Sequence, residues 1–118
     1  RLQSITKKNF DHVDNNHKPL NSDQIDELKQ LSNVLSEEVK SVSKMIEKLD
    51  FESKDFQEAN LKFEKIHSKL DKNQVSRIKK GHISTRNSIL YLGILSDTNS
   101  LSINVKELVH ALKETIHK

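Results

Sequence analysis

The sequence predicts an all-α protein, an antiparallel up-and-down bundle of three long helices with a shorter N-terminal helix. Apolar residues recur at steps of three and four through almost all of the 118 residues, as they do on one face of a helix. Only 2 glycines and 1 proline are present, too few turn-forming residues for a many-stranded β fold. Short connections between long helices make neighbouring helices antiparallel, and we expect residues 1–118 to form a single domain.

The N-terminal helix is the shortest of the four. Leu2, Ile5 and Val13 define its apolar side, and it is expected to end near Asn16–His17. Because the chain opens on Arg1 rather than on Met, we expect it to be a piece of a longer protein or a processed one.

The first long helix is predicted from about Ser22 to Leu49. Pro19 interrupts the chain just before it, and Asn21 or Ser22 can cap its first turn, where Asp23 adds favourable negative charge. Its apolar stripe consists of Leu28, Leu31, Leu35, Val42, Met45 and Leu49, widened by Ile25, Val39 and Ile46.

The second long helix follows after a few residues. Asp50 or Ser53 can cap it, and it is predicted to end near Lys79–Lys80 with Gly81 as the terminating residue. Its stripe consists of Phe56, Ala59, Phe63, Ile66 and Leu70.

The last helix is predicted to start near His82. Its stretch 96–104 is weak, because Ser, Asp, Thr and Asn side chains compete for backbone hydrogen bonds. The apolar stripe keeps its phase through this stretch, which favours one long helix. That stripe consists of Ile83, Leu90, Ile94, Leu101, Val105, Leu108 and Leu112.

Composition excludes several classes of protein. Without cysteine the chain has no disulfide framework, no thiol nucleophile and no cysteine-ligated metal. Two glycines cannot build a phosphate-binding loop, and no catalytic set of residues emerges, so we expect no enzyme and no small-molecule substrate. The net charge of +3 comes from lysines dispersed among acidic residues, and we expect no nucleic-acid partner.

Four polar residues interrupt the apolar stripes and are candidates for the seam between helices: Glu38, Arg77, Asn87 and Asp97. A carboxylate buried there needs a partner or a metal, because an unpaired one is costly to desolvate. One interpretation is a metal or anion site between helices. The favoured one is a set of structural contacts, for example an ion pair between Glu38 and Arg77.

Histidines suggest two further hypotheses. The densest set of metal-ligating side chains lies at 11–17 and includes Asp11, but two ligands on one helix face do not complete a site, so surface solvation is favoured. His67 raises the hypothesis of a histidine phosphotransfer domain, because such domains expose a histidine on a four-helix bundle. Its neighbour Ile66 lies in the apolar stripe and disfavours that interpretation.

Two segments, 85–101 and 11–20, carry a resemblance to a known family. The residue pattern of these segments, and their order along the chain, resemble those of the C-terminal cytoplasmic domain of PiT-type inorganic phosphate transporters of Bacteroidetes. That domain is PhoU-like, an antiparallel helical bundle appended to a membrane permease. The resemblance implies a regulatory or assembly role in phosphate transport on the cytoplasmic side of the inner membrane. The permease portion of the same chain, and a second copy in a homodimer, are the partners it implies.

Many PhoU-like proteins bind metal clusters through carboxylates, so the resemblance also raises the hypothesis that the chain binds a divalent or trivalent metal ion. Asp97 matches the aspartate of the family pattern, whereas the preceding Glu-Arg pair falls on Gly93 and Ile94. The fold therefore carries over better than the metal site, for which Asp97, Glu38 and Asp11 are the candidate ligands. The alternatives are a free-standing helical adaptor protein and, less favoured, phosphotransfer at His67.

Overall fold

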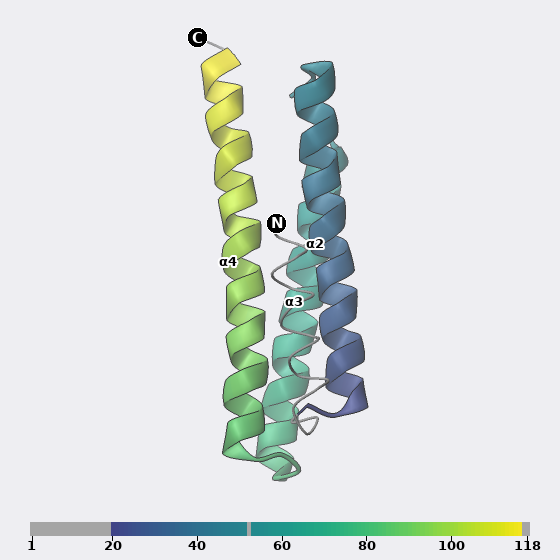
Figure 1. The fold of residues 1–118 in the computed structure, drawn as a ribbon, viewed down its shortest axis with the longest axis vertical. Coiled ribbons are helices and arrows are strands. Elements are labelled where there is room, and N and C mark those ends of the chain that lie inside the picture. The colour runs from purple at the N-terminus through teal and green to yellow at the C-terminus, as the bar shows by residue number, and fades with distance from the viewer. Residues whose placement is uncertain (1–19, 52, 117–118) are drawn as a thin grey trace.

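A computed structural model describes residues 20–51 and 53–116 of the chain. They form three helices, α2 (Ser22–Lys48), α3 (Asp55–Lys80) and α4 (Thr85–Ile116), which pack against one another (Figure 1). No strand occurs in these described ranges, so the prediction of an all-α protein is confirmed. The predicted N-terminal helix lies outside the described residues.

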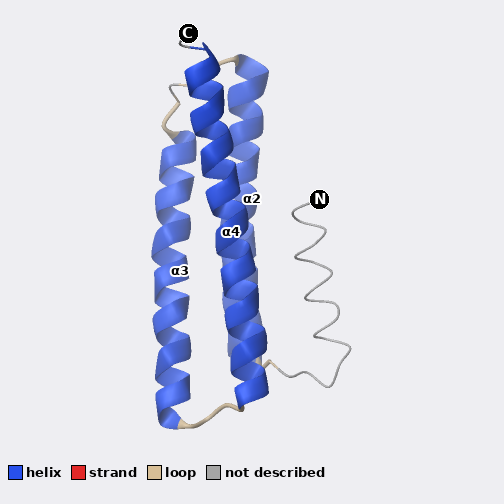
Figure 2. Cartoon of the chain, turned by 90° about the vertical axis from the view of Figure 1, so that its left-hand side faces the viewer, coloured by secondary structure: helices blue, strands red, loops and turns tan. Residues whose placement is uncertain are grey.

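The chain reverses direction at each of two short connections. Figure 2 shows α3 and α4 side by side, joined by a loop at one end of the bundle. Gln24, in the first turn of α2, hydrogen-bonds both to Gln74 near the end of α3 and to Asn87 near the start of α4. The first turn of α2 therefore lies level with the last turns of α3 and the first turns of α4.

α2 begins with a complete capping box. The Asn21 side chain accepts a hydrogen bond from the backbone of Gln24 at 2.9 Å, and the Gln24 side chain accepts one from the backbone of Asn21 at 3.0 Å. Of the two predicted caps, the structure selects Asn21. The helix ends at Lys48, because Leu49 adopts a left-handed conformation with φ of 53°.

The residues at the two ends of α3 explain where this helix starts and stops. The N-cap of α3 is Lys54, which makes no side-chain capping bond, so neither predicted cap, Asp50 or Ser53, occupies that position. The Ser53 hydroxyl accepts a bond from the backbone N–H of Asp55 at 3.2 Å, in the turn before the helix. At the other end Gly81 has φ of +70°, and its N–H donates to the carbonyl of Ile78 at 3.0 Å. The predicted end of this helix is confirmed.

α4 starts at Thr85, three residues later than His82, because the Ser84 hydroxyl accepts from the backbone N–H of Asn87 at 3.0 Å and caps the helix there. It runs unbroken through the weak stretch 96–104. The Thr98 hydroxyl donates to the carbonyl of Ile94 at 2.7 Å, and Ser102 bonds to α2, so these side chains do not compete with the helix.

The buried face of α4 differs from the predicted stripe. Leu90 and Leu101 are only half-buried and Leu108 is 48% exposed. Ile94 and Val105 of the predicted stripe are buried as expected. The interior also receives residues outside that stripe, of which some are polar and some apolar: Asn87, Tyr91, Leu95, Thr98, Ser102 and Val109. Hydrophobicity alone did not predict the polar members of this face, which are acceptable inside because Asn87 and Ser102 hydrogen-bond with α2.

The apolar core consists of two clusters along the bundle. One is built around Leu28, Leu31, Phe63 and Tyr91 at the end where α2 begins. The other lies toward the opposite end and contains Val42, Met45, Phe51, Phe56, Val105 and Val109. In sequence order, Glu38 on α2 and Ser102 on α4 fall between the two clusters, so a polar layer separates them.

The two glycines should respond oppositely to substitution by alanine. Gly81→Ala should lower the free energy of unfolding by about 1–2 kcal/mol, since φ of +70° is strained for a residue with a Cβ. Gly93→Ala should raise it by about 1 kcal/mol, because Gly93 is helical and its added Cβ meets nothing within 4 Å. Urea denaturation followed by circular dichroism measures both, and equal signs would contradict the assigned backbone.

Candidate functional site in the polar seam

Three groups of polar side chains meet where the helices face one another. The amide group consists of Gln24, Gln74 and Asn87. Gln24 and Asn87 exchange two hydrogen bonds of 2.8 Å, and the Gln24 side chain also donates to Gln74 at 3.0 Å. Gln24 and Gln74 are fully buried, so these bonds replace water that the amides have lost. One side chain from each helix is thereby fixed at the same level.

The Glu27 group lies one turn further along α2. Tyr91 donates its hydroxyl to Glu27 Oε1 at 2.6 Å, and Arg77 donates to Glu27 Oε2 at 2.6 Å. Asn73 adds a bond of 3.1 Å to the same oxygen. The Arg77 guanidinium also lies 5.5 Å from the centre of the Tyr91 ring and donates to Gln74 at 2.9 Å, which joins this group to the amide group.

Tyr91 is the buried centre of that group. Burial, and then its hydrogen bond to the negative Glu27 carboxylate, raises the pKa of the Tyr91 hydroxyl well above its ordinary value. The hydroxyl therefore stays protonated at neutral pH and acts as a hydrogen-bond donor, not as a base or nucleophile. This favours a structural over a catalytic role.

The Glu38 layer is the third group, and it separates the two apolar clusters. The Glu38 side chain is fully buried, and Ser102 of α4 lies 3.0 Å from each of its carboxylate oxygens. Burial raises the pKa of the Glu38 carboxyl to about 7, partly opposed by hydrogen bonds from Ser102 and Asn60, while the nearby charge of Glu64 raises it further. Glu38 therefore changes its charge near neutral pH.

The seam candidates from the sequence divide clearly. Glu38 and Asn87 are buried and Arg77 is partly buried at helix contacts, whereas Asp97 is exposed on α4. The suggested ion pair between Glu38 and Arg77 is wrong, because Arg77 pairs with Glu27. Residue 38 lies 11 positions beyond residue 27 along α2, a distance of about 16 Å along the axis, which places the two carboxylates at different levels.

The candidate metal ligands are not brought together. Within the ranges 20–51 and 53–116, no three His, Asp or Glu side chains lie close enough to hold a metal ion. Asp97 is exposed, and the hydrogen-bond partners of Glu38 are a hydroxyl and an amide. Asp11 lies outside the described residues. The donor set around Glu38 does not fit a hard cation, which takes several carboxylate oxygens.

His67 is half-buried against its own helix. Its ring stacks on Phe63 with centroids 6.0 Å apart, and its Nε2 atom is buried without a hydrogen-bond partner. A phosphotransfer histidine must offer a ring nitrogen to the phosphoryl group. The burial of Nε2 argues against such a role for that nitrogen.

The sequence reasoning missed seven members of the seam: Gln24, Glu27, Asn60, Asn73, Gln74, Tyr91 and Ser102. A signal for two of them was present. Gln24 precedes Leu28 by four residues and Gln74 follows Leu70 by four, so both continue an apolar stripe. Polar residues that extend an apolar stripe at its end are thus buried here like those inside it.

The helices were also compared with the requirements of a membrane span and with known proteins. None of the helices in the described part of the chain is long and apolar enough to cross a membrane. Compared with protein-family models, curated proteins and solved structures, the chain shows no significant match.

Tyr91→Phe should lower the free energy of unfolding by about 2 kcal/mol, because the lost hydroxyl leaves Glu27 Oε1 without its donor in a largely dehydrated seam. Thr115→Val is the control. It also removes a hydroxyl, but an exposed one bonded only to its own helix, and should change stability by less than about 0.5 kcal/mol. Urea denaturation of both variants measures the difference. Equal stability of the two would contradict the structural role of the Tyr91 hydroxyl.

Glu38 should make the stability of the chain depend on pH. Its folded pKa of about 7 lies above the ordinary 4.5, so the folded chain holds this proton more tightly than the unfolded chain between these values. The contribution of Glu38 to the free energy of unfolding is complete below pH 4.5 and is lost as the pH rises to about 7, a fall of about 3 kcal/mol at most.

Glu38→Gln keeps the shape of the side chain and removes this titration. Its free energy of unfolding should therefore fall less than that of the unsubstituted chain between pH 4.5 and 7. Glu37→Gln is the matched control, since the Glu37 side chain is 52% exposed and its substitution should leave the pH profile in place. Parallel profiles for the unsubstituted chain and Glu38→Gln would show that Glu38 is not the titrating group.

Proposed function

We propose that the chain is a PhoU-like regulatory or assembly domain of an inorganic phosphate permease. In this proposal it lies on the cytoplasmic side of the inner membrane and acts on the permease portion of the same polypeptide. Docking of the bundle on the permease, or pairing of two bundles in a homodimer, shifts with phosphate supply and so biases transport.

The observation that carries the proposal is the place of the resembling segment 85–101 in the bundle. Asn87, Tyr91, Leu95 and Thr98 come from this segment and are all buried. Asn87 and Tyr91 make hydrogen bonds to α2, at Gln24 and Glu27 respectively. Several residues of the resembling segment are therefore among those that hold the helices together, which supports a shared bundle.

The chemistry of the seam supports a regulatory more than a catalytic role. Glu27 is held by Tyr91, Arg77 and Asn73, and Tyr91 is kept protonated. Groups saturated by one another fix the register of the helices and are not available to a substrate. In this proposal the domain acts on the permease by changing where its outer surfaces bind, and not by catalysing a reaction.

A phosphate-uptake experiment with the complete parent gene tests the proposal. The sequence upstream of Arg1 should contain many apolar spans of about 20 residues. Deleting residues 1–118 from that gene should change the ratio of phosphate uptake in starved and phosphate-replete cells by about fivefold or more. An epitope tag on the permease reports its abundance, so that loss of the protein is distinguished from loss of regulation.

Gly93→Ala in the same gene is the matched control. It alters the domain without removing a contact and should leave the uptake ratio unchanged. An upstream sequence without membrane spans, or an unchanged uptake ratio in the deletion strain at equal permease abundance, would overturn the proposal.

A free-standing helical interaction protein is the second candidate. The observation that favours it is the exposure of large apolar side chains on α4, where Ile89 is 69% and Ile103 is 47% exposed. A short polar sequence upstream of Arg1 would favour this candidate over the permease domain.

A further inference from the structure

The outward side of α3 carries lysines in a single row, here called the basic face. Its members are Lys62, Lys65, Lys69, Lys72 and Lys79. They are separated by three, four, three and seven residues, which places them on one side of a helix over about 26 Å. All five are exposed, so the basic face is open to solvent along most of α3.

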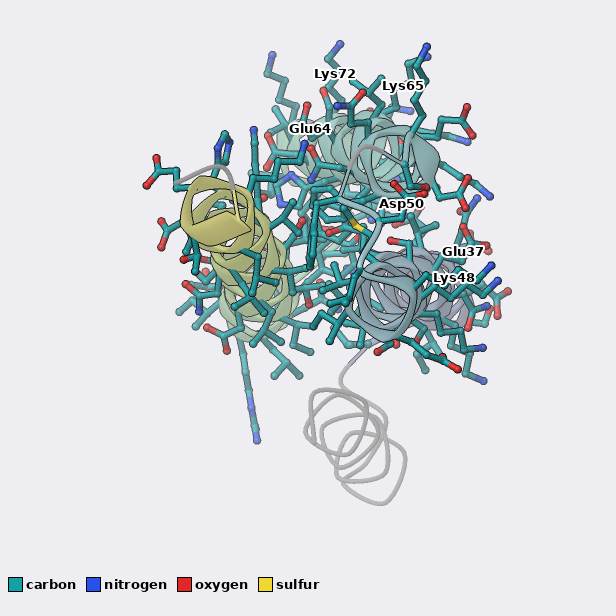
Figure 3. All side chains as sticks on the ribbon, turned by 90° about the horizontal axis from the view of Figure 1, so that it is seen from above. Glu37, Lys48, Asp50, Glu64, Lys65 and Lys72 are labelled. Atoms are coloured by element: carbon teal, nitrogen blue, oxygen red, sulfur yellow. The ribbon has the colours of Figure 1, made fainter. Side chains whose placement is uncertain are left out.

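The basic face points away from the rest of the bundle. Figure 3 shows Lys65 and Lys72 projecting from α3 on the side opposite α2 and α4. The inward side of the same helix carries Phe63 and Leu70, which are fully buried. The orientation of the lysines is therefore set by the packing of α3.

The positive charge of this face is mostly uncompensated. Lys62 at its edge contacts Glu37 of α2 at 3.5 Å, and Glu64 contacts Lys106 of α4 at 4.0 Å. Within the described part of the chain, no carboxylate forms an ion pair with Lys65, Lys69 or Lys72. Glu37 and Glu64 are thus paired with lysines at the edges of the face, and Glu58 lies one turn before Lys62, outside the central stretch from Lys65 to Lys72.

The face also has a shallow hollow with an apolar edge. A hollow of about 510 Å³ is lined by Leu61, Glu64, Lys65, Ser68, Lys69, Lys72 and Asn73. Its three lysines outnumber its one carboxylate, that of Glu64, which contacts Lys106 of α4. Leu61 is 56% exposed, and Val75 further along α3 is 41% exposed. Lysine ammonium groups and a hydroxyl around such a hollow can bind the phosphate group of a lipid. Exposed aliphatic side chains beside them can contact the boundary between the lipid headgroups and the acyl chains.

The composition of the face distinguishes a lipid surface from a nucleic acid. Proteins that bind nucleic acids use arginines and aromatic side chains for planar hydrogen bonding and stacking. The only arginine of α3, Arg77, is turned inward to Glu27, and the aromatic residues of this helix, Phe56 and Phe63, are buried. Lysines with aliphatic neighbours are typical of helices that lie on anionic membranes.

We propose that α3 binds the surface of an anionic phospholipid bilayer through Lys65, Lys69 and Lys72, with Leu61 and Val75 at the acyl boundary. The helix lies parallel to the membrane plane, and the lipid phosphates take the place of solvent around the lysine ammonium groups. This binding does not depend on a permease, so it is separate from the proposed function. In a permease domain it would hold the bundle against the bilayer.

Vesicle flotation of the 118-residue chain tests this inference. The chain should bind vesicles of phosphatidylcholine containing about 30 mol% phosphatidylglycerol, and binding should weaken as salt is raised. The triple variant Lys65→Gln/Lys69→Gln/Lys72→Gln should bind about a hundredfold more weakly, as expected for three lysines near a charged surface. Circular dichroism of this variant should remain that of the unsubstituted chain, because the three side chains are exposed.

A second triple variant, Lys29→Gln/Lys48→Gln/Arg86→Gln, is the matched control. It removes the same charge from exposed positions on α2 and α4, and should bind nearly as well as the unsubstituted chain. An equal loss in both variants would show that only net charge matters and would overturn the proposal. Equal binding to pure phosphatidylcholine vesicles, or binding to a DNA or RNA oligonucleotide that is tighter than vesicle binding and lost in the first variant, would overturn it as well.

Discussion

Gln24 is the residue on which the alignment of the three helices depends. Its side chain completes the capping box of α2 by accepting a hydrogen bond from the backbone of Asn21. The same side chain also hydrogen-bonds to Gln74 of α3 and to Asn87 of α4. Because it is fully buried, a shift of any helix along its axis would leave amide groups unpaired in the core. One turn away, the ion pair between Glu27 of α2 and Arg77 of α3 also fixes how these two helices are aligned along their axes. Register is thus set at one end of the bundle, and the rest of the packing depends on it.

The Glu38 layer has a different energetic character. The amide and Glu27 groups supply a donor for every buried carboxylate or carbonyl oxygen that they contain, although the side-chain NH2 group of Gln74 is buried without a partner. Glu38 has hydroxyl and amide partners only, so its charged form is poorly compensated. The bundle is therefore firmly held at one end and carries a charge-sensitive layer between its two apolar clusters.

The distribution of charge is set by the same packing. Arg77 is drawn inward by Glu27, while the lysines of α3 that have no inward partner occupy the outer side. Lysines of α3 that alternate with acidic residues in sequence are thereby aligned on one exposed side of the helix. Polar contacts within the seam and the exposed surface of α3 are thus two consequences of how α3 is rotated about its axis.

The sequence by itself determined the three long helices and some of their ends. Steps of three and four predicted the helices, and Asn21 and Gly81 marked the start of α2 and the end of α3, because capping depends on neighbouring residues. It also indicated Glu38, Arg77 and Asn87 as seam residues. Only the tertiary structure decided that Arg77 pairs with Glu27, that Asp97 is exposed and that α4 buries Ser102 while Leu108 is exposed. The reason is that spacing along one helix does not specify which level of another helix it meets, and a polar residue is buried only where a neighbouring helix supplies its partner.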